Sequence, residues 1–180
     1  MIFDRPRWYS VSVMTADEVK QILRLEPLRA EGGFFRETYR SRWQVAEEYL
    51  PEGMRGTRSI ATAIYFMLTP ETFSALHRMP GTEIFHFYAG DPVVMLQLLP
   101  DKTSQTITLG PDLANGQRPQ VVVRGHVWQG SRLAPGGKWA LLGTTMSPGF
   151  DYKDFELGKR DELAAQYPGG AEMIRQYTRS

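Results

Sequence analysis

The amino-acid sequence predicts an all-β fold, a sandwich or barrel with short helices near both ends. Three observations lead to this prediction. Many short runs alternate apolar and polar residues, which is the period of a strand with one buried face. Pro, Gly, Asp and Asn separate these runs and mark turns between strands. Apolar residues at helical spacing occur only near the two ends of the chain.

The first predicted element is a helix over residues 15–25. Thr15 and Glu18 have the spacing of a capping box, in which each side chain accepts a hydrogen bond from the backbone amide of the other residue. Pro27 ends the helix because it cannot continue the helical hydrogen bonding. One apolar face is formed by Val19, Ile22 and Leu23.

Strands follow from Gly32 onward. In "GGFFRETYRS", strict alternation places Glu37 and Tyr39 on one face and Arg36 and Arg40 on the other. The segment over residues 159–178 is helical again and is interrupted by Pro168-Gly169-Gly170. The remaining strands are predicted over residues 61–68, 73–79, 83–89, 93–99, 105–109, 119–124, 127–133 and 138–146.

Length and composition narrow the classes of function. The 180 residues suit one domain, residues 1–180. A net charge of +1 gives no electrostatic reason to expect nucleic acid or a membrane as partner. The chain has no cysteine, which excludes disulfides and thiolate-bound zinc. The N-terminus lacks the apolar core of a signal peptide, and no run reaches about 18 apolar residues, so we expect a cytoplasmic protein.

The segment "HRMPGTEIFHFYAG", residues 77–90, resembles the first motif of the cupin superfamily, in which His-x-His precedes a glutamate and a glycine. His77, Glu83 and Gly90 match this pattern, whereas Met79 occupies the place of the second histidine. The second cupin motif is matched poorly by "VVVRGHVWQG", where Gln129 stands at the position of the histidine. His126 occupies a glycine position in a turn, and we expect its side chain to be exposed.

Most of residues 15–170 are similar to one branch of that superfamily, the DUF985 or cupin 5 family. The similarity is carried by the segments "EGGFFRETYRS", "TAIYFMLTPETFSALHRMPGTEIFHFYAGDPV", "LGPDLANGQRPQVVV", "VWQGSRLAPGGKWALLG" and "SPGFDYKDFELGKRDEL". The resemblance implies a jelly-roll barrel, or double-stranded β-helix, which is usually dimeric and has a pocket in its mouth. It implies no particular reaction.

Alternation along the strands gives candidate site residues. If Glu83 points inward, Phe85 and Phe87 do so as well, and His86 points outward. If His77 points inward, alternation places Phe73, Ala75 and Met79 on the same inward face. If Gln129 points inward, Ser131 does so as well. We interpret His77 and Glu83 as acid–base residues. The predicted substrate-binding residues are Glu37, Tyr39, Met79, Phe85 and Gln129.

Each candidate also has a structural interpretation. His77 can be a barrel-lining residue that only forms hydrogen bonds, and Glu83 can be one half of a salt bridge. Glu37 and Tyr39 can lie on a solvated face instead of the pocket. Gln129 can simply satisfy backbone groups. The sequence leaves these alternatives open.

The ligand types argue against a tightly bound metal. One imidazole and one carboxylate remain at the motif positions, and the thioether of Met79 is a poor ligand for Fe, Mn or Ni. We therefore expect no cofactor, or at most a weakly held divalent ion. The predicted function is a small-molecule-binding cupin, with acid–base chemistry such as epimerisation, isomerisation or dehydration of a sugar, nucleotide sugar or related polar metabolite. The alternatives are a non-catalytic metabolite-binding protein and a metal-dependent oxygenase or isomerase.

The sequence also predicts a homodimer. A jelly roll has sheet edges that need to be covered. The segment "RWYSVSV", residues 7–13, is apolar and strand-prone, and it has no obvious place in a single barrel. We expect it to pair with the sheet of a second copy.

Overall fold

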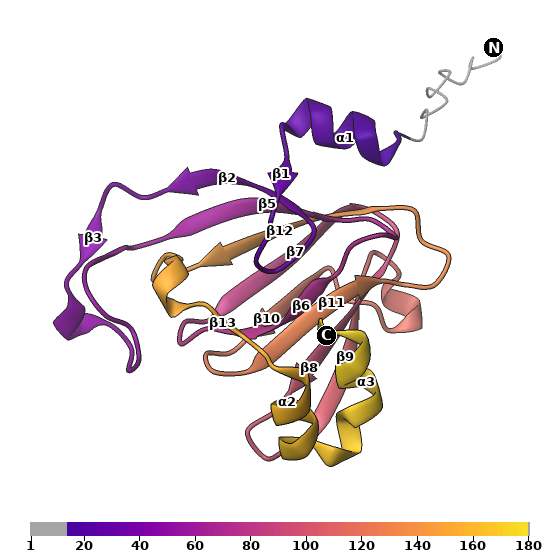
Figure 1. Cartoon of the computed structure of the whole chain (residues 1–180). Coiled ribbons are helices and arrows are strands. Elements are labelled where there is room, and N and C mark those ends of the chain that lie inside the picture. The colour runs from indigo at the N-terminus through magenta and orange to yellow at the C-terminus, as the bar shows by residue number, and fades with distance from the viewer. Residues whose placement is uncertain (1–13, 180) are drawn as a thin grey trace, which may run out of the picture.

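The computed structural model describes residues 14–179. They form two antiparallel sheets packed face to face, with helices on the outer faces (Figure 1). The strand order is β1-β2-β5-β12-β7-β10 in the first sheet and β13-β6-β11-β8-β9 in the second. The predicted fold class is confirmed. Residues 7–13, which we expected to pair with a second copy, lie outside the described residues.

The six-stranded sheet consists of β1 (Glu26–Pro27), β2 (Phe34–Arg40), β5 (Thr62–Leu68), β12 (Ala140–Met146), β7 (Glu83–Gly90) and β10 (Gln120–Val123). The five-stranded sheet consists of β13 (Glu156–Leu157), β6 (Ser74–Arg78), β11 (Trp128–Leu133), β8 (Val93–Leu98) and β9 (Ser104–Leu109). A separate pair, β3 (Gln44–Val45) and β4 (Arg58–Ser59), forms an arm at one side (Figure 1).

Three α-helices cover the sheets. They are α1 (Ala16–Leu23), α2 (Arg160–Gln166) and α3 (Ala171–Gln176). The short 3-10 helices are η1 (Glu47–Tyr49), η2 (Leu113–Asn115), η3 (Tyr152–Asp154) and η4 (Pro168–Gly170). Helix α1 begins with the predicted capping box, in which the Thr15 backbone amide donates to Glu18 at 2.7 Å. It ends before Pro27, because Arg24 adopts a left-handed conformation with φ of 53°. Within residues 14–179 no helix combines the length and the apolar character that crossing a membrane requires.

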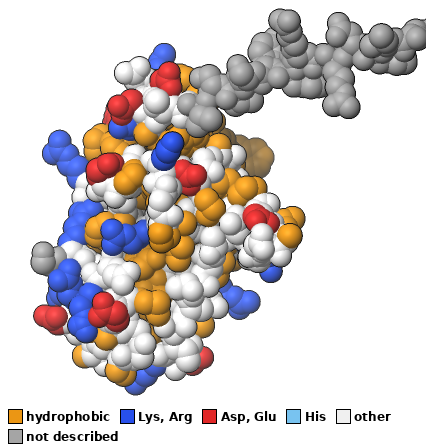
Figure 2. Space-filling view, turned by 90° about the vertical axis from the view of Figure 1, so that its right-hand side faces the viewer, with side chains coloured by type: hydrophobic (Ala, Val, Ile, Leu, Met, Phe, Trp, Pro, Cys, Tyr) orange, Lys and Arg blue, Asp and Glu red, His pale blue; other side chains and the backbone are white. Residues whose placement is uncertain are grey.

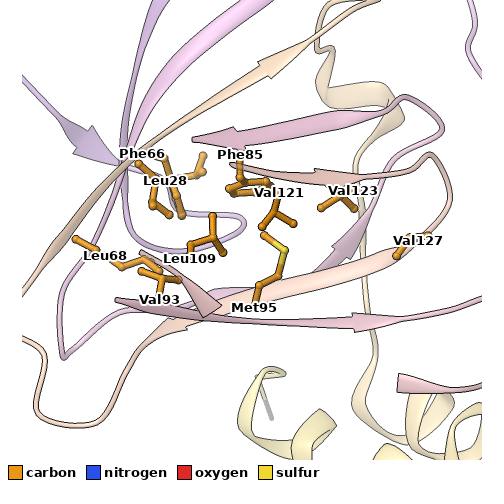
Figure 3. Packing of buried hydrophobic residues seen from close by; sticks show 12 residues of the cluster. Leu28, Phe66, Leu68, Phe85, Val93, Met95, Leu109, Val121, Val123 and Val127 are labelled. Atoms are coloured by element: carbon orange, nitrogen blue, oxygen red, sulfur yellow. The ribbon is translucent and has the colours of Figure 1, made fainter. Parts of the chain in front are cut away.

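The main core fills one part of the space between the two sheets (Figure 3). Phe66 and Phe85 from the first sheet pack against Val93, Met95 and Leu109 from the second. On the outer face of the second sheet, a further apolar cluster lies under α2 and α3. Because β8 is buried on both faces, its sequence "VVMLQL" is nearly continuously apolar.

One side face of the molecule combines hydrophobic and basic side chains. Figure 2 views the side that lies to the right in Figure 1, opposite the β3–β4 arm. Hydrophobic side chains form a band there, and Lys and Arg side chains gather mainly along one edge.

Two β-bulges overturn predictions made from strict alternation. In β2 the register slips between Glu37 and Tyr39, which leaves Thr38 as the extra residue. Tyr39 therefore pairs with Ala63 and faces outward, while Arg40 pairs with Thr62 and faces the interior. The predicted inward position of Tyr39 is wrong because one added residue reverses the faces of all residues beyond it.

The second bulge lies in β6. Ser131 of β11 pairs with Ser74, and Gln129 pairs with His77, so β6 spans the same distance with one more residue. Ser74 consequently points inward with His77. Phe73 does not point inward as predicted, because its ring contacts the guanidinium groups of Arg132 and Arg179, at 4.8 Å and 5.9 Å.

Candidate functional site

A buried polar cluster joins the two sheets. The side-chain amide of Gln129 on β11 donates to Nε2 of His77 on β6 at 2.7 Å and to a carboxylate oxygen of Glu83 on β7 at 3.0 Å. All three side chains are buried. One amide group thus connects an imidazole and a carboxyl group from opposite sheets.

His77 is held in one orientation from several sides. Its Nδ1 lies 2.8 Å from the carbonyl oxygen of Ala75, so this nitrogen carries the proton and Nε2 accepts from Gln129. Its ring stacks on Phe155 with centroids 5.0 Å apart. Burial lowers the pKa of His77, partly offset by the charge of Glu83 and by the bond to Ala75. His77 is therefore neutral at neutral pH.

Glu31 is a second carboxyl group in this cluster, and the sequence analysis missed it. Its carboxylate accepts a hydrogen bond from Ser74 at 2.5 Å, and its other oxygen lies 3.9 Å from Nε2 of His77. Glu31 lies in the loop between β1 and β2. The following Gly32 allows that loop to approach β6, since a Cβ there would lie 2.1 Å from the Phe73 carbonyl oxygen. A sequence signal therefore existed: an acidic residue directly before a glycine pair.

Both carboxyl groups have raised pKa values; the Glu83 side chain is buried, and that of Glu31 is 14% exposed. Burial raises the pKa of Glu83 to about 7, an effect that the charge of Glu31 reinforces and that His77 and Thr144 oppose. Burial likewise raises the pKa of Glu31 to about 7, against the hydrogen bond from Ser74 and the charge of Arg179. Carboxyl groups with pKa values in this range are suited to acid–base chemistry near neutral pH.

The two carboxyl groups face a cavity of about 90 Å³ between the sheets. Its wall is largely apolar and aromatic, with Leu28, Phe35, Ile64, Met79, Met146, Phe150, Tyr152 and Phe155. Its polar residues are Glu31, Glu37, Arg40, Thr62, Glu83 and Thr144. A small apolar chamber with a few convergent polar groups is typical of a ligand site.

Arg40 and Glu37 form a second polar group in the cavity wall. The Arg40 guanidinium donates to both carboxylate oxygens of Glu37, at distances between 2.7 and 3.2 Å. A further bond of 3.1 Å reaches the carbonyl oxygen of Phe150. Both side chains are about 40% exposed, at 43% and 38%, so this pair lies at the open part of the wall.

A buried ion pair anchors the wall that contains Phe150 and Phe155. Arg58 on β4 is only 3% exposed and donates to the carboxylate of Asp154 at 2.8 and 3.2 Å. It also lies 3.9 Å from Asp151. The β3–β4 arm is thereby tied to the loop around η3, which supplies aromatic residues to the cavity.

The predicted site residues take different places. Glu83, Met79 and Glu37 line the cavity. His77 and Gln129 belong to the cluster but are not among the lining residues, and each is 1% exposed. Phe85 points inward but belongs to the core instead of the cavity wall. Tyr39 is 54% exposed on the outer face. Alternation identified the right strands but could not show which inward residues reach the cavity.

Polar side chains continue from His77 across the five-stranded sheet. His77, Gln129, Gln97 and Gln105 are register partners on β6, β11, β8 and β9. Gln105 donates to Gln97 at 3.1 Å. Among the described residues, Oε1 of Gln129 and Oγ of Ser131 are buried without a hydrogen-bond partner. A polar row thus crosses the inner face of this sheet, beside core residues such as Met95 and Leu109 on the same face.

The other two histidines lie away from the cluster. His86 points outward as predicted and contacts Thr145 at 3.1 Å and Gln120 at 3.4 Å. His126 is exposed in the predicted turn, with a left-handed φ of 66°. That conformation favours glycine, the residue the cupin motif has at this position.

The donor atoms of the cluster do not fit a tightly held metal. His77 Nε2 and Glu83 Oε2 both accept from the same Gln129 nitrogen, so their lone pairs point at an amide and not at a common ion. Within residues 14–179 no group of three or more His, Cys, Asp or Glu side chains is arranged to hold a metal. The absence of a stoichiometric metal stays a prediction, to be checked by elemental analysis of protein purified without chelator.

Comparison with known proteins shows the protein family to which this chain belongs. The family model of the cupin superfamily branch described as Cupin_5 (DUF985) matches residues 17–158. The chain therefore belongs to this cupin family. The resemblance inferred from the sequence motifs is confirmed.

Individual relatives agree with this assignment. An uncharacterised protein of Saccharomyces cerevisiae is 32% identical over 142 residues, which cover 74% of this chain and 71% of the yeast protein. A crystal structure from Shewanella oneidensis is similar with 34% identity and a TM-score of 0.80, covering 92% of this chain and 98% of that one. A hypothetical protein from Leishmania major has 31% identity and a TM-score of 0.84, covering 93% and 100%. None of these descriptions names an activity.

Proposed function

We propose that this cupin is a metal-free acid–base enzyme, an epimerase, isomerase or dehydratase, acting on a sugar, nucleotide sugar or related polar metabolite in the cytoplasm. The observation that supports the proposal is the pair Glu31 and Glu83, two largely buried carboxyl groups with pKa values raised to about 7 in one cavity. Groups with pKa values near the working pH are the most effective general acids and bases.

The proposed roles follow from which groups face the cavity. One carboxylate of the Glu31–Glu83 pair removes a proton from a carbon next to a carbonyl group, and the other carboxyl group returns a proton to the substrate. The proton count of the enzyme is then unchanged after each turnover. His77 and Gln129 act as positioning residues, because the Gln129 amide holds Glu83 and His77 holds that amide. This assignment moves the proposed base from His77, which is buried behind the wall, to the carboxyl pair.

Deuterium exchange tests the proposal without knowledge of the substrate. Wild-type protein is incubated in deuterium oxide with a panel of aldoses, ketoses, amino sugars and nucleotide sugars, and loss of C–H signals is followed by proton NMR. We expect exchange in at least one compound. Glu83→Gln and Glu31→Gln should slow it by about 100-fold or more. Exchange that is unaffected by both substitutions would contradict the assigned roles.

A non-catalytic metabolite-binding protein is the second candidate. It is supported by the cluster's internal bonding, since both nitrogens of His77 are already engaged within the protein. A panel compound that raises the melting temperature but shows no exchange would favour this candidate over the enzyme.

We also propose that the chain forms a homodimer through the outer face of the six-stranded sheet. Tyr39, Tyr88 and Val122 are each at least half exposed there, at 54%, 51% and 50%. A patch of this kind is typical of protein interfaces. Light scattering should give twice the chain mass of 20.5 kDa, and Val122→Glu should reduce it to the single-chain value. A single-chain mass for the wild type at micromolar concentration would refute the dimer.

A further inference from the structure

Acidic side chains outnumber basic side chains in the lining of the cavity. Among the described residues, its lining includes three carboxyl groups, from Glu31, Glu37 and Glu83, and one guanidinium group, from Arg40. Arg40 is already paired with Glu37 at 2.7 Å. The remaining excess of negative charge therefore belongs to Glu31 and Glu83.

Within residues 14–179, neither of these two carboxyl groups has a Lys or Arg side chain within salt-bridge distance. The contact of Glu31 with His77 is 3.9 Å long, and His77 is neutral because burial lowers its pKa. Arg179 lies nearby, but its guanidinium donates to the backbone carbonyls of residues 29, 30 and 31. Glu83 is 7% exposed and is held only by neutral donors. A buried carboxylate without a cation is costly, and a ligand cation would reduce that cost.

The aromatic wall favours the same type of ligand. Phe35, Phe150, Tyr152 and Phe155 line the cavity, and the rings of Phe150 and Tyr152 meet edge to face at 4.9 Å. Aromatic faces attract cations, and the attraction grows where water is excluded. A phosphate or carboxylate would instead face two acidic groups, and Arg179, which lies near Glu31, already donates to backbone carbonyls.

We propose that the cavity binds a small primary amine, whose ammonium group lies against Glu31 and Glu83. The inference rests on the proposed function for its chemistry and narrows the substrate class to an amine-bearing metabolite, such as an amino sugar, in place of a nucleotide sugar. Binding requires at least one of the two carboxyl groups to be ionised, and the other can still carry the proton that the proposed reaction returns. Because their pKa values are raised to about 7, amine binding near neutral pH releases a proton.

Titration calorimetry of the full chain with three probes of similar size tests the proposal. The probes are propylamine, 1-propanol and propionate, which are cationic, neutral and anionic at pH 7. We expect propylamine to bind at least about 10-fold more tightly than 1-propanol, as charge-assisted hydrogen bonds require, and propionate to bind least. Titrations in two buffers of different ionisation enthalpy should reveal the released proton.

Variants identify the groups responsible. Glu83→Gln and Glu31→Gln should each weaken propylamine binding by about 10-fold or more while leaving 1-propanol unaffected. The matched control is Glu71→Gln, since Glu71 is exposed in a turn outside the cavity. Equal affinity for propylamine and 1-propanol, tighter binding of propionate, or no heat with propylamine in the millimolar range overturns the proposal.

The outcome is separable from that of the proposed function. Amine-selective binding without deuterium exchange in any compound would leave this inference standing and remove the enzyme. Deuterium exchange in uncharged sugars without amine-selective binding would support the enzyme and overturn the proposed amine site.

Discussion

Glu83 and Phe85 lie two residues apart on the same face of β7, yet they belong to different parts of the barrel interior. Phe85 packs in the core with Phe66 and Met95 (Figure 3), whereas Glu83 faces the cavity and the polar cluster. Two residues of one strand thus belong to different regions: the core around Phe85 stabilises the fold, whereas the polar cluster around Glu83 buries an ionisable group at a cost in free energy. The comparison indicates that stability and binding can be changed separately by substituting neighbouring residues.

Truncation of Phe85 should have the largest effect on stability. Phe85→Ala removes a ring that is 1% exposed and leaves a cavity in the core, which should lower the free energy of unfolding by about 3–5 kcal/mol. Urea unfolding measures this loss. Glu83→Gln is the matched substitution two residues away, and we expect it to change stability far less. Equal losses for both variants would contradict the separation of core and site.

Substitution of His77 should have the next largest effect. His77→Ala leaves the Ala75 carbonyl without its partner, removes one acceptor of the Gln129 amide and exposes the Phe155 ring to a void. We expect a loss of about 2–3 kcal/mol. Because His77 lies outside the cavity lining, water cannot readily take its place.

His77→Gln distinguishes a positioning role from catalysis. Glutamine retains hydrogen bonding but cannot accept a proton as a base. If His77 only positions Gln129, this variant should keep most of the amine affinity and most of the exchange rate. A loss of about 100-fold in exchange with normal stability would return the role of base to His77.

The pH dependence of stability should show a smaller effect. The folded-state pKa values of Glu31 and Glu83, about 7, lie above the ordinary value of 4.5, so the folded protein binds more protons than the unfolded chain. Their contribution to stability is complete below pH 4.5 and is lost as the pH rises through 7. Below pH 6.5 His77 has the opposite effect, because its pKa is lowered.

Measurement between pH 6.5 and 8.5 reports mainly the carboxyl groups, because most of the opposing effect of His77 lies at lower pH. We expect the free energy of unfolding to fall by on the order of 1 kcal/mol over this window. The double variant with Glu31→Gln and Glu83→Gln should remove most of the decline, whereas Glu71→Gln should not. A wild-type stability that stays flat or rises across the window would show that the pair is not protonated in the folded protein.

Much of the fold could be predicted because strand alternation and turn residues are local signals. The eight longer strands after β2 lie within one residue of their predicted ends, except at the start of β12, which is Ala140 instead of residue 138. The short strands β1, β3, β4 and β13 have two residues each, too few to show any alternation. Helices α2 and α3 fall inside the predicted helical segment.

The site could be predicted only in part, because it depends on contacts between distant segments. Glu83 and Met79 were found through motif spacing, and both line the cavity. Tyr39 and Phe73 were placed wrongly because a bulge in each strand interrupts alternation. Glu31 and Arg40 were missed, since the first lies in a loop and the second acquires its inward direction from a bulge. The depth of His77 behind the cavity wall follows only from the packed structure.

The bulge at Thr38 has a consequence for how this chain tolerates changes in length. Arg40 pairs with Thr62, and Tyr39 with Ala63, only because Thr38 is left out of the ladder. Deletion of Thr38 would produce a regular strand in which Tyr39 and Arg40 keep their partners. Insertion of a paired residue after Glu37 would instead exchange their directions. Whether the charged Arg40 side chain faces the cavity therefore depends on the number of residues in β2 as much as on their identity. Deletion of Thr38 should be among the best tolerated changes of length in this strand.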